Sequence, residues 1–202
     1  MKSLIAAILF SMVSAIATNA QTTVWKADKA HSNVNFTVTH LMISEISGNF
    51  KEYDVNVSMN GEDFKTADIQ AVIKTASVNT ENEGRDKHIR SDDFFNADSF
   101  PNMTFKSEKI EQMGTDTYKI YGSLTIRNAT KPVVLDAKYK GKQDAWGTTK
   151  LGFKATTTIN RFDYDVKWDK KMDAGGFIVA NNVDITLQME LNKQTKDDAK
   201  KK

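Results

Sequence analysis

Cysteine is absent from the 202-residue sequence, and proline occurs only twice. The absence of cysteine excludes disulfide scaffolds, thiolate metal sites, thiol catalysis and a lipidated N-terminal cysteine. A chain of this size can bury a full core, so it does not need disulfides to fold. The two prolines, Pro101 and Pro132, are each predicted to stand just before a strand, where a missing N–H is tolerated.

A strongly basic surface is absent too. The sequence has a net charge of +2, but segment 193–202 alone carries five lysines and two aspartates. When this surplus and Lys2 are left out, residues 21–192 have a net charge of about −2. Nucleic-acid binding requires a clustered basic face, so no nucleic-acid partner is expected. We expect 193–202 to be a disordered Lys-rich tail that makes at most transient membrane contact.

Long apolar runs are missing after the N-terminus. A short positive start precedes residues 4–16, which are apolar except for two serines, and Thr18-Asn19-Ala20 then supplies small residues. This three-part layout is typical of a secretory signal peptide, and the run is shorter than the roughly 20 residues of a spanning helix. We therefore predict a signal peptide over 1–20 and a periplasmic or secreted protein from Gln21. A retained N-terminal anchor is the alternative.

Alternation of apolar and polar residues is the main pattern in the remaining sequence. In Val183–Leu191, five apolar residues alternate with four polar ones. Because successive side chains of a strand point to opposite sides, this pattern predicts a strand with one buried face. Evenly spaced strands without long helices predict an up-and-down barrel or a sandwich. The eight predicted strands centre on residues 34–38, 55–59, 69–73, 103–105, 118–126, 133–139, 151–159 and 183–191.

The interval 79–100 is the one long stretch without alternation. Within it, 83–95 is predicted to form a short helix, because its charged residues recur at a helical spacing of four. Phe94 and Phe95 stand next to these charges. They are interpreted either as a plug that closes one end of the fold or as part of a cap over a ligand tube.

The interior of an eight-stranded barrel holds either packed side chains or one small ligand. Several predicted inward positions are small, among them Ala71, Gly122, Ala137 and Ala155. Small residues either let aromatic rings interdigitate or leave a slot. The pattern by itself does not separate a filled core from an open tube, and it slightly favours a filled core.

Short motifs are spread in order from Trp25 to Leu191. They are Trp25-Lys-Ala-Asp28, His31-Ser32, His40-Leu41-Met42, Gly48-Asn-Phe50, Ser77-Val78-Asn79-Thr80, Arg85 to Phe95, Phe100-Pro101, Gly122-Ser-Leu124-Thr125-Ile126, Thr130-Lys131-Pro132-Val133 and Ile159-Asn160-Arg161. In these motifs the chain resembles the YceI-like family of polyisoprenoid-binding, lipocalin-like proteins. The family often has a glycine soon after the Asn-Arg pair, whereas here Phe162 follows, so the loop at that end of the barrel is expected to differ.

The resemblance implies an all-β fold, namely an elongated eight-stranded antiparallel barrel over 21–192 with one or two short helices. It also implies that the barrel holds a long-chain amphiphile, such as a polyisoprenoid, an isoprenoid quinone or a fatty-acid-type lipid. We therefore expect an exported binding protein that needs no cofactor and is not an enzyme, with a homodimer left open. One alternative is a barrel with a filled core that acts as a stress-related interaction protein without ligand. Another is a small enzyme or pigment-binding protein that uses the same cavity.

The predicted site combines inward-facing residues with two arginines. Arg85 and Arg161 are the candidates to meet an anionic head group such as a pyrophosphate through two parallel hydrogen bonds. The residues predicted to line the tube are Phe36, Val38, Phe94, Phe95, Phe105, Ile120, Leu124, Leu135, Phe153 and Leu187.

The three histidines, His31, His40 and His88, lie far apart and show none of the close spacings of zinc motifs, so no metal site is predicted. Asp28, His31 and Ser32 have the residue types of a hydrolase triad. However, adjacent residues on a strand point to opposite faces, and no Gly-x-Ser-x-Gly motif occurs. No catalytic residue is therefore predicted.

Overall fold

The computed structural model describes residues 21–173 and 175–195. The predicted signal peptide and residues 196–202 of the predicted tail lie outside this part of the chain. Lys193, the first residue of the predicted tail, is the last residue of a strand. The backbone N–H of Gln194 still donates a hydrogen bond to the Val24 carbonyl at 2.8 Å. The ordered barrel therefore runs slightly beyond the predicted boundary at 192.

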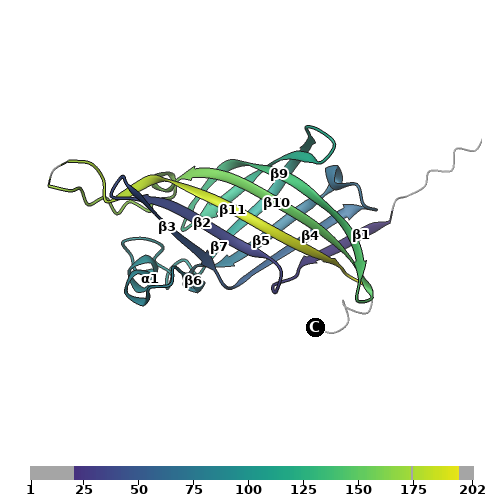
Figure 1. Ribbon diagram of the computed structural model, residues 1–202, viewed down its shortest axis with the longest axis horizontal. Coiled ribbons are helices and arrows are strands. Elements are labelled where there is room, and N and C mark those ends of the chain that lie inside the picture. Colours follow the sequence, from purple (N-terminus) through teal and green to yellow (C-terminus); the bar gives the residue numbers. More distant parts are fainter. Residues whose placement is uncertain (1–20, 174, 196–202) are drawn as a thin grey trace, which may run out of the picture.

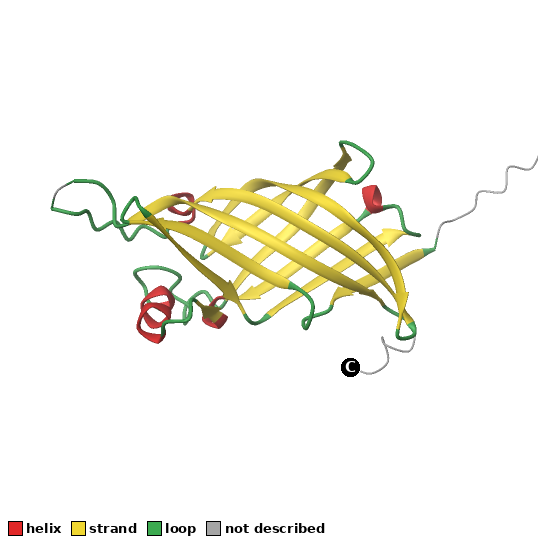
Figure 2. Cartoon of the chain, in the orientation of Figure 1, coloured by secondary structure: helices red, strands yellow, loops and turns green. Residues whose placement is uncertain are grey.

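The described chain is built mainly of β-strands, drawn in Figures 1 and 2. The strands are β1 (Thr22–Ala27), β2 (Asn33–His40), β3 (Ser44–Phe50), β4 (Tyr53–Asn60), β5 (Asp68–Lys74), β6 (Val78–Asn79), β7 (Asn102–Gln112), β8 (Thr117–Ile126), β9 (Ala129–Ala145), β10 (Thr148–Asn160) and β11 (Val179–Lys193). The helical elements are α1 (Glu83–Arg90) and the short 3-10 helices η1 (Phe64–Thr66), η2 (Thr75–Ser77) and η3 (Arg161–Tyr164). No helix among these residues is long and apolar enough to cross a membrane.

The sheet closes on itself. Its antiparallel neighbours run in the order β1-β4-β5-β7-β8-β9-β10-β11, and β11 pairs again with β1. Where β1 ends, β2 takes its place beside β11, and its hairpin partner β3 leads into β4. The wall thus has eight strand positions, three of which are each built from two shorter strands, because β6 also continues β5 and pairs with β3. Closure gives nearly every strand two hydrogen-bonded neighbours, so the barrel exposes little sheet edge.

All eight predicted strands are present, which confirms the eight-stranded antiparallel barrel. The strands β1, β3 and β6 were not predicted, because each is short and β3 has few apolar residues. The prediction for Pro101 is confirmed, whereas Pro132 lies inside β9 opposite Ser123. At Pro132, β9 pairs only with β8, since its ladder with β10 begins at Asp136. That stretch is locally an edge, where proline costs no ladder hydrogen bond on the open side.

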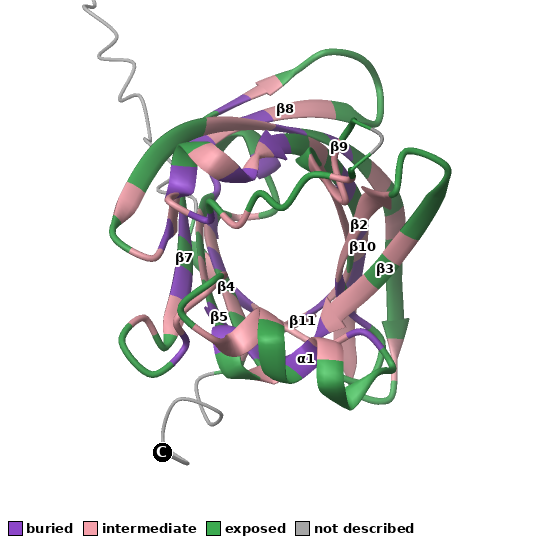
Figure 3. Ribbon diagram, turned by 90° about the vertical axis from the view of Figure 1, so that its left-hand side faces the viewer, coloured by how far each residue is buried: buried purple, intermediate pink, exposed green. Residues whose placement is uncertain are grey.

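The helix is shorter than the predicted range 83–95, since α1 ends at Arg90. Its first turn is held by the Asn82 side chain, which accepts from the Arg85 backbone N–H at 2.9 Å. The carboxylate of Asp86, a buried residue, accepts from the Thr80 backbone N–H at 2.9 Å and fixes α1 to the end of β6. Figure 3 looks along the barrel from the end at which α1 lies across one side. The helix therefore sits as a partial cover at one end of the barrel.

Candidate ligand-binding site

The interior of the barrel contains a cavity of about 380 Å³ that is lined almost entirely by apolar side chains. This volume falls within the range of small-molecule sites in proteins, about 300–1,000 Å³. All twelve residues of the predicted site line this cavity, including both arginines. That they contact a ligand stays a prediction. The interior is therefore open, whereas the sequence pattern alone slightly favoured a filled core.

The cavity is closed at the end of the barrel near β1. Phe64, the first residue of η1, turns its ring into the barrel and stacks on Phe153 with ring centroids 4.4 Å apart. Tyr118 meets Phe64 edge to face at 5.1 Å. Beyond these rings, Trp25 and Met59 are 0% and 2% exposed and do not line the cavity. An aromatic floor thus separates the cavity from solvent at this end.

Small residues in the wall decide where the interior stays open. Ala71, Ala137 and Ala155 line the cavity and leave space beside them. Gly122 does not leave such space, because a Cβ at this position would lie 2.6 Å from the ring of Phe105. The aromatic ring thus occupies the space above the glycine of a neighbouring strand. Both effects expected of small inward residues, interdigitation and an open slot, occur in the same barrel.

The opposite end of the cavity lies between α1, β2 and the segment between η3 and β11, and its lining there includes the exposed residue His88. We call this end the mouth. Trp168 stacks on Phe94 with centroids 5.4 Å apart, and the imidazole of His88 meets the Trp168 ring edge to face at 5.6 Å. Nε2 of His88 also lies 2.7 Å from Oδ2 of Asp93. The two ring contacts of Trp168 join the α1 region to the segment on the other side of the mouth.

Phe94 and Phe95 both line the cavity at the mouth. Phe95 packs edge to face on Phe50 with centroids 5.8 Å apart, on the wall of the barrel. Phe100 is not part of the lining and instead receives the guanidinium of Arg127 over its ring at 5.3 Å.

Arg161 is fully engaged by the backbone. Its Nε donates to the carbonyl of Ala180 at 2.9 Å, and its Nη1 and Nη2 donate to Val166 at 2.8 Å and Val179 at 3.3 Å. Burial lowers the pKa of this guanidinium, and nearby Asp169 partly opposes the effect. These three bonds attach the segment after η3 to the start of β11. Arg161 therefore has a structural role, and few of its donors remain for a head group.

The loop after Arg161 takes a left-handed turn at Asp165, whose φ is 59°. Aspartate tolerates this conformation better than most residues other than glycine. The turn brings Tyr164 into the core, where burial raises the pKa of its hydroxyl to about 12. The chain thus makes this bend with an aspartate in place of a glycine.

Arg85 is differently placed. Its Nε donates to Thr80 Oγ1 at 2.7 Å and its Nη2 to the Thr80 carbonyl at 2.6 Å. Its Nη1 makes no hydrogen bond within the described residues. The side chain is half-buried and lines the cavity near the mouth. Of the two predicted arginines, Arg85 is the one with a complete terminal NH2 group left for a ligand, because every nitrogen of Arg161 already donates a hydrogen bond.

Sequence reasoning missed several lining residues. Phe64 and Trp168 lie in segments without apolar alternation, so no periodic signal marked them. Ile178 directly precedes β11 and also lines the mouth. The aromatic type of Phe64 and Trp168 was the only signal available, because each stands isolated among polar residues.

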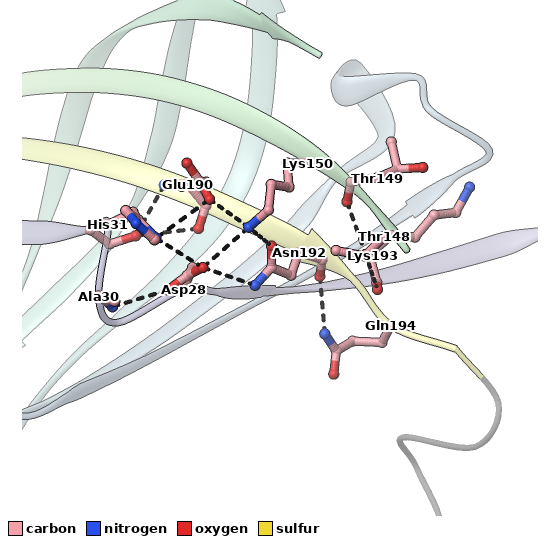
Figure 4. Close-up of polar contacts among 11 residues, drawn as sticks. Asp28, Ala30, His31, Thr148, Thr149, Lys150, Glu190, Asn192, Lys193 and Gln194 are labelled. Atoms are coloured by element: carbon pink, nitrogen blue, oxygen red, sulfur yellow. Dashed lines mark hydrogen bonds and ion pairs between the residues drawn. The ribbon is translucent and has the colours of Figure 1, made fainter. Parts of the chain in front are cut away.

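A polar cluster on the outer face of the barrel contains the one group within the described residues that has the composition of a metal site: Asp28, His31 and Glu190 (Figure 4). Their ligand atoms lie within 4.8 Å of one another. Nζ of Lys150, whose side chain is 10% exposed, lies 2.6 Å from Glu190 Oε1 and 3.2 Å from Asp28 Oδ2. An ammonium group thus stands where a cation would have to bind. We interpret this cluster as structural, joining β10 and β11 to the end of β1.

The electrostatics of the cluster follow from these contacts. The hydrogen bond to Glu190 raises the pKa of Lys150, with a further contribution from Asp28. Burial acts against ionisation of Asp28, but hydrogen bonds from His31, Asn192, the Ala30 N–H and Lys150 outweigh it. They hold the pKa of Asp28 well below its ordinary value. The imidazole of His31 lies beside the carboxylates of Asp28 and Glu190, whereas the hydroxyl of Ser32 is hydrogen-bonded to the backbone of Glu190. The residues considered as a triad therefore do not form one.

Comparisons with known proteins agree with the architecture. A UPF0312 protein of Staphylococcus aureus (strain N315) is 34% identical over 167 residues, which are 82% of this chain and 95% of that protein. The crystal structure of a Campylobacter jejuni YCEI protein is 34% identical, with a TM-score of 0.68, and the match covers 83% of this chain and 96% of that one.

A structure described as a polyisoprenoid binding domain from Saccharophagus degradans has a TM-score of 0.64 at 16% identity, covering 84% and 98% of the two chains. This likeness shows the fold alone. The model of the YceI-like domain matches residues 25–191, which is most of the chain and nearly all of the barrel that encloses the cavity. The protein therefore belongs to the YceI-like family.

Proposed function

We propose that this protein is an exported binding protein that sequesters or carries a long-chain amphiphile inside the barrel. The observation that carries the proposal is the shape of the cavity, which is apolar, closed by an aromatic floor and open at the mouth. A tube of this kind accepts an extended apolar chain and leaves a polar head at the opening. A polyisoprenoid, an isoprenoid quinone and a fatty-acid-type lipid all have this form.

The hydrophobic effect supplies the affinity. Each methylene moved from water into an apolar site contributes about 0.8 kcal/mol. The lining near the floor offers no hydrogen-bonding side chain among the residues that contact the cavity there, such as Leu135, Phe153 and Leu191. A polar group carried to that depth would lose its hydrogen bonds to water without replacement. The cavity therefore favours an apolar tail over a polar molecule of similar size.

Polar side chains gather at the mouth. Arg85, His40 and His88 line the cavity at this end. Arg85 has a donor without a partner within the described residues, so it is the group placed to bind an oxygen atom of the head. A charged hydrogen bond of this kind is stronger than a neutral one. We assign head-group binding to Arg85 and the anchoring of the loop to Arg161.

Export and the absence of catalysis form part of the same proposal. The three-part pattern over residues 1–20 supports export to the periplasm or the exterior. A binding role without catalysis is supported by the family, and by a solved structure of the same fold that is described as a polyisoprenoid binding domain. Lipid-like ligands that dissolve poorly in water require a carrier outside the membrane. An exported protein with an apolar cavity would meet this requirement.

The experiment that tests the proposal is extraction of the purified full chain with organic solvent, followed by mass spectrometry. We expect one class of long-chain lipid in near-stoichiometric amount, and an N-terminus at Gln21 in the exported protein. Addition of a prenol, an isoprenoid quinone or a fatty acid to delipidated protein should raise its unfolding temperature, because ligands that bind only the native state stabilise it. An empty extract together with no thermal shift from any of the three would contradict the proposal.

A further inference from the structure

The turn between β2 and β3 presents apolar side chains to solvent. Leu41, Met42 and Ile43 are 36%, 55% and 87% exposed, and they are three consecutive residues. Soluble proteins scatter single exposed apolar residues over their surface, whereas contiguous ones mark contact sites. The turn lies at the same end of the barrel as α1 and the segment between η3 and β11 (Figure 1). The exposed residues are therefore next to the mouth.

The backbone of this turn is of the kind that bulky residues avoid. Leu41 and Met42 have φ values of 50° and 64°, and the Ile43 N–H donates to the His40 carbonyl at 3.2 Å. Positive φ at both central positions is the pattern of a type I′ turn, for which Asn-Gly is the favoured sequence. A strained conformation at residues with no structural need for it points to a function of their side chains. Here the two strained residues, Leu41 and Met42, directly precede Ile43, the most exposed residue of the turn.

The turn is held in place by the neighbouring segment. The Leu41 N–H donates to the Ile178 carbonyl at 2.8 Å. A Cβ at Gly176 would lie 2.5 Å from Sδ of Met42 and 3.1 Å from Cε of Met172, so both methionines pack over this glycine. We call Leu41, Met42, Ile43 and Met172 the apolar tip. Its position relative to the mouth is fixed by these contacts.

The apolar tip continues the lining of the cavity. His40 and Ile178 both line the mouth, and they directly adjoin the hydrogen bond that holds the tip. A ligand that leaves the cavity at this point would pass directly from the mouth onto the tip. The nearby Lys170 and Lys171 are balanced by Asp169 and Asp173, so this end of the segment has no net charge.

We infer that the apolar tip inserts into the interfacial region of a lipid bilayer, so that the mouth faces the membrane while ligand is exchanged. The inference rests on the proposed function for the identity of the cargo, and on the exposed, strained and cavity-adjoining residues for the surface. The occupant is a phospholipid surface, because the tip is a small convex apolar projection and not a groove that would receive a protein helix or strand. The balanced charge favours insertion into neutral bilayers as well as anionic ones.

The test is co-sedimentation of the full mature chain with vesicles of phosphatidylcholine alone and of phosphatidylcholine mixed with phosphatidylglycerol. The variant is Leu41→Asn, Met42→Gly and Ile43→Thr, which gives the turn its favoured sequence and removes the apolar side chains. We expect its vesicle partition coefficient to fall roughly tenfold or more. Its unfolding temperature should be unchanged or higher, which excludes loss of folding as the cause.

The matched control is Trp146→Ser. Trp146 is 86% exposed in the turn between β9 and β10, at the closed end of the barrel, and should not affect vesicle binding. The inference would be overturned if the triple variant still bound vesicles as the wild type does. It would also be overturned if Trp146→Ser abolished vesicle binding. Binding confined to anionic vesicles and removed by salt would also overturn it, because it would point to the lysines of the C-terminal segment.

The same variants separate this inference from the proposed function. A prenol added from ethanol should bind the triple variant as tightly as the wild-type chain, whereas its transfer from vesicles should slow roughly tenfold. If no lipid binds in the barrel but the wild type still sediments through the tip, the proposed function fails and the docking surface stands. If lipid binds and transfer from vesicles is unchanged, the docking surface fails and the proposed function stands.

Discussion

Ala155 of β10 lies directly opposite Ala137 of β9, and both methyl groups face the cavity. An indole at position 155 would occupy the space that we assign to the lipid tail. We therefore expect Ala155→Trp to lose bound lipid. The free energy of unfolding of the empty protein should not fall, because the new ring fills a void and loses no packing. Solvent extraction with mass spectrometry and urea unfolding would measure the two effects.

The matched control is Thr156→Trp, since Thr156 is the next residue of β10 and its side chain is exposed on the outer face. This variant should keep its lipid. If Ala155→Trp instead costs about 1–3 kcal/mol, as overpacking of a filled core does, the space beside Ala155 is not available to a ligand.

Arg161→Met should destabilise the fold without changing which ligand binds. The substitution removes charged hydrogen bonds to three backbone carbonyls, those of Val166, Val179 and Ala180. Buried carbonyls left without a donor cost about 1–3 kcal/mol. Urea unfolding would measure the loss, and hydrogen exchange should show faster opening of the segment before β11. Unchanged stability combined with lost lipid binding would place Arg161 at the head group instead.

Arg85→Gln should alter head-group selectivity. We expect affinity for an anionic amphiphile such as a fatty acid to fall about tenfold, which corresponds to about 1.4 kcal/mol. The affinity for an uncharged prenol should remain, and Arg85→Lys should keep part of the affinity for the fatty acid. Displacement of a fluorescent lipid would give both affinities. Equal losses for both ligands in Arg85→Gln would show that the arginine only supports α1 through Thr80.

The cluster around Lys150 predicts a dependence of stability on pH. The folded state lowers the pKa of Asp28 below the ordinary value of about 3.9, so the unfolded state binds more protons in acid. The stability that ionised Asp28 contributes is therefore fully present above about pH 5 and is lost as the pH falls through the lowered pKa. Lys150, whose pKa is raised, contributes below its ordinary pKa of about 10.4 and loses its contribution only in stronger base.

Urea unfolding of the wild type and of Asp28→Asn between pH 2 and pH 8 would measure this contribution. The variant should be less stable near neutral pH, and the difference should shrink towards pH 2. The matched control is Asp54→Asn, which removes an exposed partner of Lys29 and should have little effect. A difference between wild type and Asp28→Asn that is constant over the whole range would contradict the assignment.

Much of the fold was predictable because one physical rule produces it. A barrel with a dry inside and a wet outside imposes a period of two on every long strand, and Val183–Leu191 shows that period without a break. In short strands this alternation is too brief or too irregular to be recognised. In β3, Ile46 and Phe50 are the only large apolar residues, and in β1 the exposed Val24 masks the alternation.

The site was predictable in part. The twelve predicted residues include the walls of the tube, since inward positions follow from the same alternation. Whether the tube is open could not be predicted, because it depends on how rings from one strand cover the glycines of another, as Phe105 covers Gly122. The two arginines could not be told apart from the sequence. Their difference lies in which backbone carbonyls the fold brings within reach of Arg161.

The aromatic floor formed by Phe64 and Phe153 gives the barrel a direction. A barrel closed at one end has a single opening, so a chain-like ligand of the kind we propose would enter tail first and leave head first. It cannot be threaded through. The distance from the mouth to the floor would then select ligands by the length of their tail. A short tail would leave space next to the aromatic floor. A tail longer than the cavity would leave its last units outside the mouth, in contact with the surface that the mouth faces.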